Sequence, residues 1–112
     1  MRGYQELNDV ISVAGLEAAE TEWSGWLEGY WWVGKVVLRA EADQPFDLFV
    51  RRRGSDGSLG MELTVESYGE IVPAGQRHET DYPLTTGMSF CVGVKNNGPT
   101  AGDFKVSLVL VE

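Results

Sequence analysis

Short runs in which apolar and polar side chains alternate dominate this chain. The clearest is KVVLRAEA at residues 35–42, which places Val36, Leu38 and Ala40 on one side of an extended chain. Because successive side chains of a β-strand point to opposite faces, this period of two predicts a strand with one buried face. No stretch shows a convincing helical period, and the good helix formers at 16–22 are predicted to form a loop or a single turn.

Seven other segments are also predicted as strands, and one of them, 76–82, is polar enough to be expected at the edge of a sheet. Together the predicted strands are residues 9–14, 21–27, 35–42, 46–52, 61–67, 76–82, 88–95 and 103–111. The further side chains expected to face the core are Phe46, Leu48, Val50, Met61, Leu63, Val65, Phe90, Val92, Val94, Phe104, Val106, Leu108 and Leu110.

Turn signals separate these strands, and the chain contains fourteen glycines and four prolines. Residues 54–58 include Asp-Gly, a strong hairpin signal because both positions tolerate positive φ. Residues 72–76 form a Pro-x-Gly turn, and 95–103 form a longer polar loop. Roughly eight short strands with such spacing predict an all-β fold, an antiparallel β-sandwich of Ig-like or jelly-roll type. We expect one domain over residues 1–112, with residues 1–8 as an extended N-terminal arm.

Charge and composition narrow the class of partner. Seventeen acidic residues against nine basic ones give a formal net charge of −8, which argues against nucleic acid as a partner. No apolar run approaches the ~20 residues that span a bilayer, and no signal peptide is recognised, so no membrane association is expected. The single cysteine, Cys91, excludes a disulfide framework within one chain.

Residues that could support catalysis or metal binding are sparse. His78 is the only histidine, and we expect it to be exposed on an edge strand, with Thr80 on the same face. Cys91 is expected to be packed or half-buried, because no base is placed near it. Asp43, Asp47 and Asp56 lie in or beside turns, but the spacing of a dedicated calcium loop is absent. We therefore expect no catalytic residues, no cofactor and no metal.

All four tryptophans lie in the stretch WSGWLEGYWWVG at 23–34. Trp23 and Trp26 are three residues apart, so on one extended strand they face opposite sides. Trp31 and Trp32 are adjacent and diverge in the same way. We expect one ring of each pair in the core and one at a second surface, where exposed tryptophans suit either sugar stacking or a protein interface.

The only basic cluster is the Arg-Arg-Arg run at 51–53. Since its side chains alternate between faces, it forms no continuous positive patch. It is either a solvated or salt-bridged strand end or a contact with another protein, because arginine is enriched at interfaces. The candidate interface residues are Trp23, Trp26, Tyr30, Trp31, Trp32, Arg51, Arg52 and Arg53.

The order of motifs along the chain resembles small β-sandwich virion proteins of tailed phages. The motifs are SGWL at 24–27, SDG at 55–57, VPAG at 72–75, VGVKNNG at 92–98 and FKV at 104–106. The resemblance implies a capsid decoration protein, a head or tail accessory protein or a fibre module. Such a protein would be made in the host cytoplasm and reside in the virion. It would bind other virion proteins and catalyse no reaction.

A weaker resemblance links FDLFVRR at 46–52 and FCVGVKNNGPTAGDFKVSLVL at 90–110 to the bacterial pre-peptidase C-terminal domain. That resemblance implies an extracellular carbohydrate- or protein-binding accessory module of secreted enzymes. The chain shows no recognisable export signal and one cysteine, which favours the virion interpretation.

We therefore expect a structural virion protein that binds itself and other virion proteins. A homo-oligomer is expected, most plausibly a trimer, or else a monomer that multimerises only on its shell. Because the net charge opposes close packing of identical chains, the contact must be apolar or must pair the arginines of 51–53 with acids such as Glu20, Glu22 or Glu28.

Overall fold

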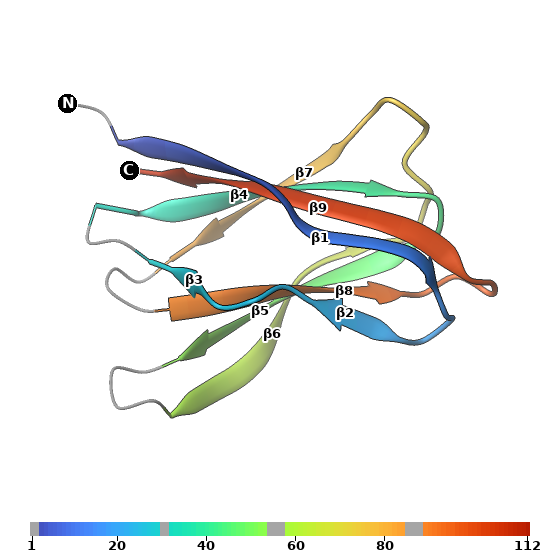
Figure 1. Ribbon diagram of the computed structural model, residues 1–112, viewed down its shortest axis with the longest axis horizontal. Helices are drawn as coiled ribbons and strands as arrows, with labels where there is room; N and C mark the ends of the chain where they lie inside the picture. Colours follow the sequence, from blue (N-terminus) through green and yellow to red (C-terminus); the bar gives the residue numbers. More distant parts are fainter. Residues whose placement is uncertain (1–2, 30–31, 54–57, 85–88) are drawn as a thin grey trace.

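The computed structural model describes residues 3–29, 32–53, 58–84 and 89–112. Two antiparallel sheets lie face to face with the core between them (Figure 1), and these residues contain no helix. The first sheet is ordered β1 (Tyr4–Leu16), β9 (Gly102–Val111), β4 (Lys35–Ala42) and β7 (His78–Pro83). The second is ordered β2 (Thr21–Trp23), β8 (Ser89–Asn96), β5 (Phe46–Arg53) and β6 (Leu59–Tyr68), and β3 (Leu27–Glu28) also pairs with β8.

The predicted β-sandwich is confirmed, and the strand order defines its type. If β2 and β3 are counted as one interrupted strand, the two sheets run 1-8-3-6 and 2-7-4-5 in chain order. This is the arrangement of a jelly roll, in which the chain crosses between the two sheets in Greek-key fashion. The predicted edge position of the polar strand is also confirmed, since β7 pairs only with β4 at one side of the first sheet.

The side chains predicted to face the core from four strands are buried. They are Val36, Leu38 and Ala40 of β4, Phe46, Leu48 and Val50 of β5, Phe90, Val92 and Val94 of β8, and Phe104, Val106, Leu108 and Leu110 of β9. Burying one phenylalanine or leucine side chain contributes about 1.5–3 kcal/mol, so this layer supplies most of the driving force for folding.

The prediction for β6 was wrong at Met61, whose side chain is 81% exposed. Two register shifts interrupt the pairing of β6 with β5. At the second, Arg51 pairs with Glu62 while Arg53 pairs with Leu59, so that Gly60 and Met61 together face the single residue Arg52. A bulge of this kind breaks the alternation on which the prediction depended.

The strand β1 is longer than predicted. Tyr4 pairs with Val111 and Leu7 with Leu108, so residues 4–8 of the segment expected to form an arm lie in the first sheet. A register shift follows at Asp9, which has a positive φ of 50° and whose backbone N–H donates to Ser107 Oγ at 2.9 Å.

The predicted strand at 21–27 is interrupted at Ser24. The hydroxyl of this residue accepts a hydrogen bond from the backbone N–H of Val92 at 3.0 Å, and its own N–H donates to the Val92 carbonyl at 2.8 Å. Trp23 pairs with Gly93 and Leu27 with Phe90, so the interruption contains one residue more than the facing segment of β8. The extra residue changes which side chains share a face on either side of it.

Two other predicted features fall at turns. The segment after β1 forms the predicted turn, at Ala18–Ala19. The Asp-Gly hairpin signal lies at residues 54–57, outside the residues that the structure describes.

Candidate functional site

The outer face of the second sheet brings together four of the eight predicted interface residues. In β5, Leu48 and Val50 point into the core, so the alternate residues Phe49, Arg51 and Arg53 point outward. We call the surface formed by Trp23, Trp26, Phe49, Arg51 and Arg53 the Trp–Arg face.

Each arginine of this face lies over a tryptophan. The guanidinium carbon of Arg51 is 5.1 Å from the centre of the Trp23 ring, and that of Arg53 is 4.1 Å from the centre of the Trp26 ring. Both distances are within the range of a cation–π contact, which contributes about 0.5–1 kcal/mol at exposed sites. The prediction that Trp23 and Trp26 face opposite sides was wrong, because the interruption at Ser24 returns Trp26 to the outer face.

The Trp23 ring is held from two further directions. It stacks on Phe49 with ring centres 6.1 Å apart and an angle of 30° between the planes. It also lies against Gly93, where a Cβ atom would be only 2.8 Å from Trp23 Cε3. A residue without a side chain at position 93 therefore allows the indole to lie close to the sheet.

Exposed apolar side chains extend this surface toward β6. Trp26 is 39% exposed, Leu59 63% and Met61 81%. Leu59 pairs with Arg53 across the β5–β6 ladder. The result is a face that combines exposed apolar area with two positive charges.

Neither Arg51 nor Arg53 forms an ion pair within the described part of the chain. The pairs found there that involve a lysine or an arginine are Lys35–Asp81, Arg39–Glu79 and Arg77–Glu41. All three lie on the first sheet or on the segment that leads into β7. Arg51 and Arg53 thus have no ion-pair partner within the described residues, although Glu62 lies opposite Arg51 in the β5–β6 ladder.

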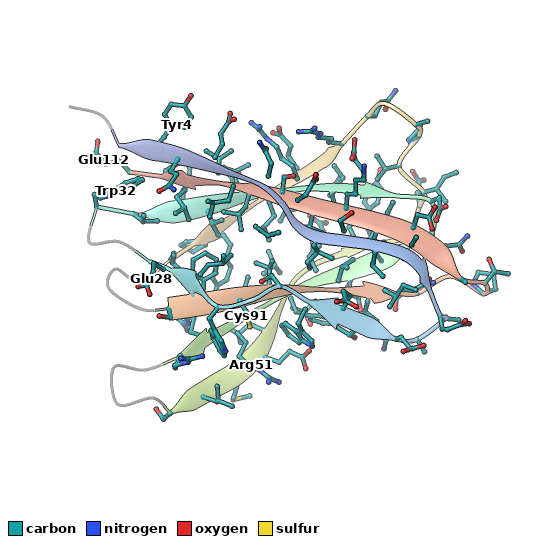
Figure 2. All side chains as sticks on the ribbon, in the orientation of Figure 1. Tyr4, Glu28, Trp32, Arg51, Cys91 and Glu112 are labelled. Atoms are coloured by element: carbon teal, nitrogen blue, oxygen red, sulfur yellow. The ribbon has the colours of Figure 1, made fainter. Side chains whose placement is uncertain are left out.

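Cys91 lies beneath the Trp–Arg face, opposite Arg51 in the β5–β8 ladder (Figure 2). Its side chain is buried, which raises the pKa of the thiol, and the positive charges of Arg51 and Arg53 offset this in part. Burial as a packed thiol agrees with the sequence prediction.

The remaining predicted interface residues are not part of this face. Trp32 is partly buried against the core and lies against Gly3, near Glu112 and away from Arg51 in Figure 2. Arg52 is half-buried and alternates away from its two neighbours. Tyr30 and Trp31 lie outside the described residues.

His78 is not exposed as predicted but is half-buried between the edges of the two sheets. Its ring stacks on Tyr68 with centres 4.0 Å apart, and its Nε2 lies 3.2 Å from Glu66 Oε2. The Nε2 atom has no well-directed hydrogen bond, whereas the Thr80 hydroxyl donates to the same Glu66 oxygen at 2.6 Å. We therefore regard the Thr80 bond as the stronger contact, and this cluster joins β6 to β7.

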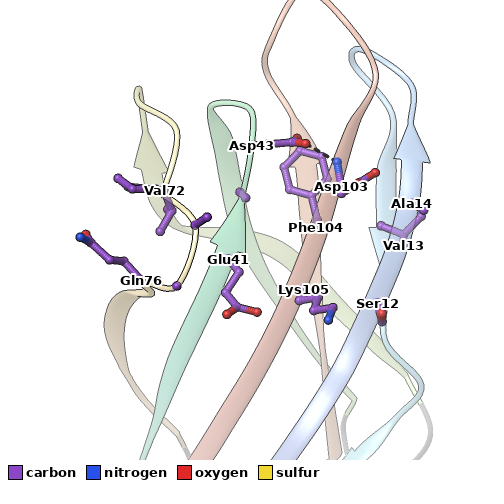
Figure 3. A pocket seen from close by; sticks show the side chains of 14 residues that line it. Ser12, Val13, Ala14, Glu41, Asp43, Val72, Gln76, Asp103, Phe104 and Lys105 are labelled. Carbon is purple, nitrogen blue, oxygen red and sulfur yellow. Dashed lines mark hydrogen bonds between the residues drawn. The ribbon is translucent and has the colours of Figure 1, made fainter.

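A groove of about 370 Å³ opens on the first sheet, and no local sequence pattern indicates it. Figure 3 shows Glu41 and Lys105 between a wall that contains Val72 and one that contains Val13. The wall at 72–76 is attached to β4 by a hydrogen bond of 2.8 Å from the Val72 N–H to the Ala42 carbonyl.

Among the described residues, no three histidine, cysteine, aspartate or glutamate side chains are grouped so that they could hold a metal ion. The same residues contain no helix that is long and apolar enough to cross a membrane.

The sequence matches no family model and no curated protein. Solved structures do resemble the fold. The SPBc2 prophage-derived protein YomS gives a TM-score of 0.65 at 6% identity, covering 100% of this chain and 96% of that one. The VP2 subviral particle of infectious bursal disease virus gives 0.52 at 11% identity, covering 96% and 32%. A glycoside hydrolase family 43 arabinoxylan arabinofuranohydrolase from Bacillus subtilis, in complex with cellotetraose, gives 0.53 at 13% identity, covering 99% and 25%.

At these identities the likeness shows the fold alone. The chain spans about a third of the length of the viral chain and a quarter of the hydrolase, but nearly the whole of the prophage protein. The β-sandwich described here is therefore one that occurs in a virus particle protein and in a prophage protein.

Proposed function

We propose that this protein is a non-catalytic structural component of a phage or virus particle, where it acts as a capsid decoration or head–tail accessory protein. The observation that carries the proposal is the Trp–Arg face, a partly exposed surface of stacked indole and guanidinium groups on one side of a β-sandwich. The likeness of the fold to a viral VP2 particle protein and to a prophage protein supports it.

The chemistry of this face suits a protein partner. Tryptophan and arginine are enriched among the residues that contribute most to protein interfaces. Arg51 and Arg53 already lie over tryptophan rings, so they lose less conformational freedom on binding than free arginines would. Because neither arginine has an ion-pair partner within the described residues, the face favours a partner surface that carries carboxylates.

The mechanism is binding, and no covalent bond is made or broken. A stable, specific contact usually buries about 800 Å² on each partner, which is more than the five residues of the face supply, so neighbouring exposed groups such as Leu59 and Met61 would contribute. The protein would be made in the host cytoplasm and would bind itself and other virion proteins in the assembled particle.

The proposal is tested by incorporation into purified virions. The parent protein and a Trp26→Ala variant would be produced in infected cells, and the amount in particles would be measured after gradient purification. Loss of an interface tryptophan costs on the order of 2 kcal/mol, so the variant should be depleted about 30-fold.

Lys35→Ala serves as the control for this experiment, because Lys35 is exposed on the other sheet and pairs with Asp81. It should enter particles like the parent. Absence of the parent protein from virions, or equal incorporation of parent and Trp26→Ala, would overturn the proposal.

A second candidate function is a carbohydrate-binding module, and the groove on the first sheet favours it. Glu41, Lys105, Ser12 and Gln76 line the groove and offer the donors and acceptors that sugar hydroxyls require. The structural neighbour from Bacillus subtilis is a glycoside hydrolase chain in complex with cellotetraose.

The tryptophans support this second function less than the sequence suggested. Arg53 lies 4.1 Å from the centre of the Trp26 ring, so a sugar that stacked on that side of the ring would have to displace it. We expect no saturable change in tryptophan fluorescence or heat of binding across a glycan panel. Micromolar binding of a glycan that is lost in Glu41→Gln would make the carbohydrate-binding module the preferred function.

A further inference from the structure

We propose that the Trp–Arg face of one copy binds the turn between β1 and β2 of a second copy, so that identical chains associate head to tail. This inference rests on the proposed function, because it names one partner of the same face. Among the acids that could pair with the arginines of another copy, it selects those of one segment, residues 17–22. We call this segment the acidic turn.

The acidic turn carries three carboxylates on a short segment. Glu17, Glu20 and Glu22 are all exposed, and none of them forms an ion pair within the described residues. Two small apolar residues, Ala18 and Ala19, form its tip and are also exposed. A segment of this composition offers both charge and apolar area to a flat surface that carries arginine and tryptophan.

The acidic turn is fixed in position by β8. The backbone N–H of Ala19 donates to the Asn96 carbonyl at 2.8 Å, and the Asn96 N–H donates to the Glu20 carbonyl at 3.0 Å. The fully buried side chain of Asn96 also donates to the carbonyls of Leu16 and Thr100, at 2.8 and 2.9 Å. Because the turn is ordered in the free chain, its ordering does not oppose association.

The end of the Trp–Arg face that carries Arg53 lies too far from the acidic turn to meet it within one molecule, although Trp23 directly follows that turn in the chain. In Figure 1 the turn between β1 and β2 is at one end of the sandwich, and the end of β5 that carries the arginines is toward the other. Arg53 pairs with Ser89 at the start of β8, whereas the acidic turn is bonded to Asn96 at its end. At ~3.3 Å per residue, the strand between them is roughly 23 Å long.

A contact between two different surfaces of identical chains is heterologous when it forms only once in each pair, as in the head-to-tail arrangement proposed here. Such a contact repeats from copy to copy and either closes into a ring or continues as a filament. A ring of three copies would be the trimer expected from the sequence. The acidic charge of the whole chain is then no obstacle, because each contact pairs the positive Trp–Arg face with the negative acidic turn.

Two variants, each with the charge of one surface removed, test the contact between the Trp–Arg face and the acidic turn. In Arg51→Gln/Arg53→Gln the Trp–Arg face loses its charge but keeps its tryptophans. In Glu17→Gln/Glu20→Gln/Glu22→Gln the acidic turn loses its carboxylates. Sedimentation velocity should show the parent as an oligomer that weakens at high salt, and each variant should raise the dissociation constant at least about 30-fold.

The decisive sample is an equimolar mixture of the two variants. Each variant keeps one intact surface, so the mixture should form a 1:1 dimer that grows no further. Arg77→Gln and Glu70→Gln are controls with single charge changes away from both surfaces, and they should assemble like the parent. Circular dichroism and urea unfolding would confirm that every variant is folded.

Each alternative result overturns the inference. If only the arginine variant loses assembly, or if the mixture stays monomeric, the face does not bind the acidic turn. If the parent remains monomeric at every concentration, the copies do not associate in solution. In each of these cases, incorporation of the parent into virions and its loss in Trp26→Ala would leave the proposed function standing.

Discussion

The indole ring of Trp23 lies directly against Gly93, its partner in the β2–β8 ladder. This contact places the ring close to the sheet, next to Phe49 and within reach of Arg51. The Trp–Arg face therefore depends on a residue that contributes no side chain to it.

Replacing Gly93 with alanine should displace Trp23. The new methyl group would lie 2.8–2.9 Å from three ring atoms, so the ring or the strand must move. Overpacking of this kind lowers stability by about 1–3 kcal/mol. Urea unfolding measures the loss, and Gly69→Ala is the control because a Cβ at Gly69 meets nothing within 4 Å. Equal stability of Gly93→Ala and the parent would contradict the described position of the ring.

Replacing Asn96 with alanine should destabilise the loops at one end of the sandwich. The buried amide donates to the carbonyls of Leu16 and Thr100 and accepts the Gly98 N–H. Leaving buried groups without partners costs about 1–3 kcal/mol. Asn97→Ala is the matched control, since Asn97 is exposed. If the unfolding midpoint of Asn96→Ala equals that of the parent, these hydrogen bonds make no net contribution to stability.

The cluster of Glu66, Thr80 and His78 should make the stability of the fold depend on pH in the acid range. The Thr80 hydroxyl is the main cause that lowers the pKa of Glu66 below 4.5, with a smaller contribution from His78, and burial opposes both. Since the folded pKa is depressed, the stabilising contribution is present above about pH 4.5 and is lost as the pH falls through the folded value. The difference in unfolding free energy between the parent and Glu66→Gln should therefore shrink in acid.

Urea unfolding from about pH 7 to about pH 3.5 measures this difference. Thr80→Val should reduce the same pH dependence, because it removes the hydroxyl that holds the carboxylate. Glu70→Gln is the control on an exposed carboxyl. If the unfolding free energies of Glu66→Gln and the parent change in parallel over the whole pH range, the cluster does not stabilise the fold as described.

Cys91 should react slowly with thiol reagents in the folded protein. Burial raises the pKa of its thiol, and the thiolate is the reactive form. Labelling at neutral pH should be slow without denaturant and fast in urea. Immediate, complete labelling of the folded chain would contradict the packing of Cys91 beneath the Trp–Arg face. Cys91→Ser should leave particle binding unchanged, because the thiol makes no contact that a partner would use.

The alternation of apolar and polar residues was sufficient to predict most of the fold. Val36, Leu38 and Ala40 share a buried face because nothing interrupts β4, so a local pattern gives the correct orientation. Met61 was placed wrongly because register shifts between β5 and β6 depend on pairing between strands, which leaves no mark on the pattern of one strand.

Four of the five residues of the Trp–Arg face were named from the sequence, their geometry was not, and their role as an interface stays a prediction. Arg51 and Arg53 share a face by simple alternation, and this signal was available in the sequence. The joint position of Trp23 and Trp26 was not, because it follows from the extra residue at the interruption beside β8. The groove on the first sheet joins four segments distant in sequence, and no local pattern indicates it.

The pairing of β1 with β9 also determines when the chain can finish folding. Leu16 pairs with Gly102, so about 86 residues must leave the ribosome after β1 before its partner is available. At the usual speed of translation this takes on the order of ten seconds. During that time β1 is an unpaired strand open to other nascent chains. Rapid, simultaneous synthesis of many copies would therefore favour aggregation, and chaperones that bind nascent chains should raise the yield of folded protein.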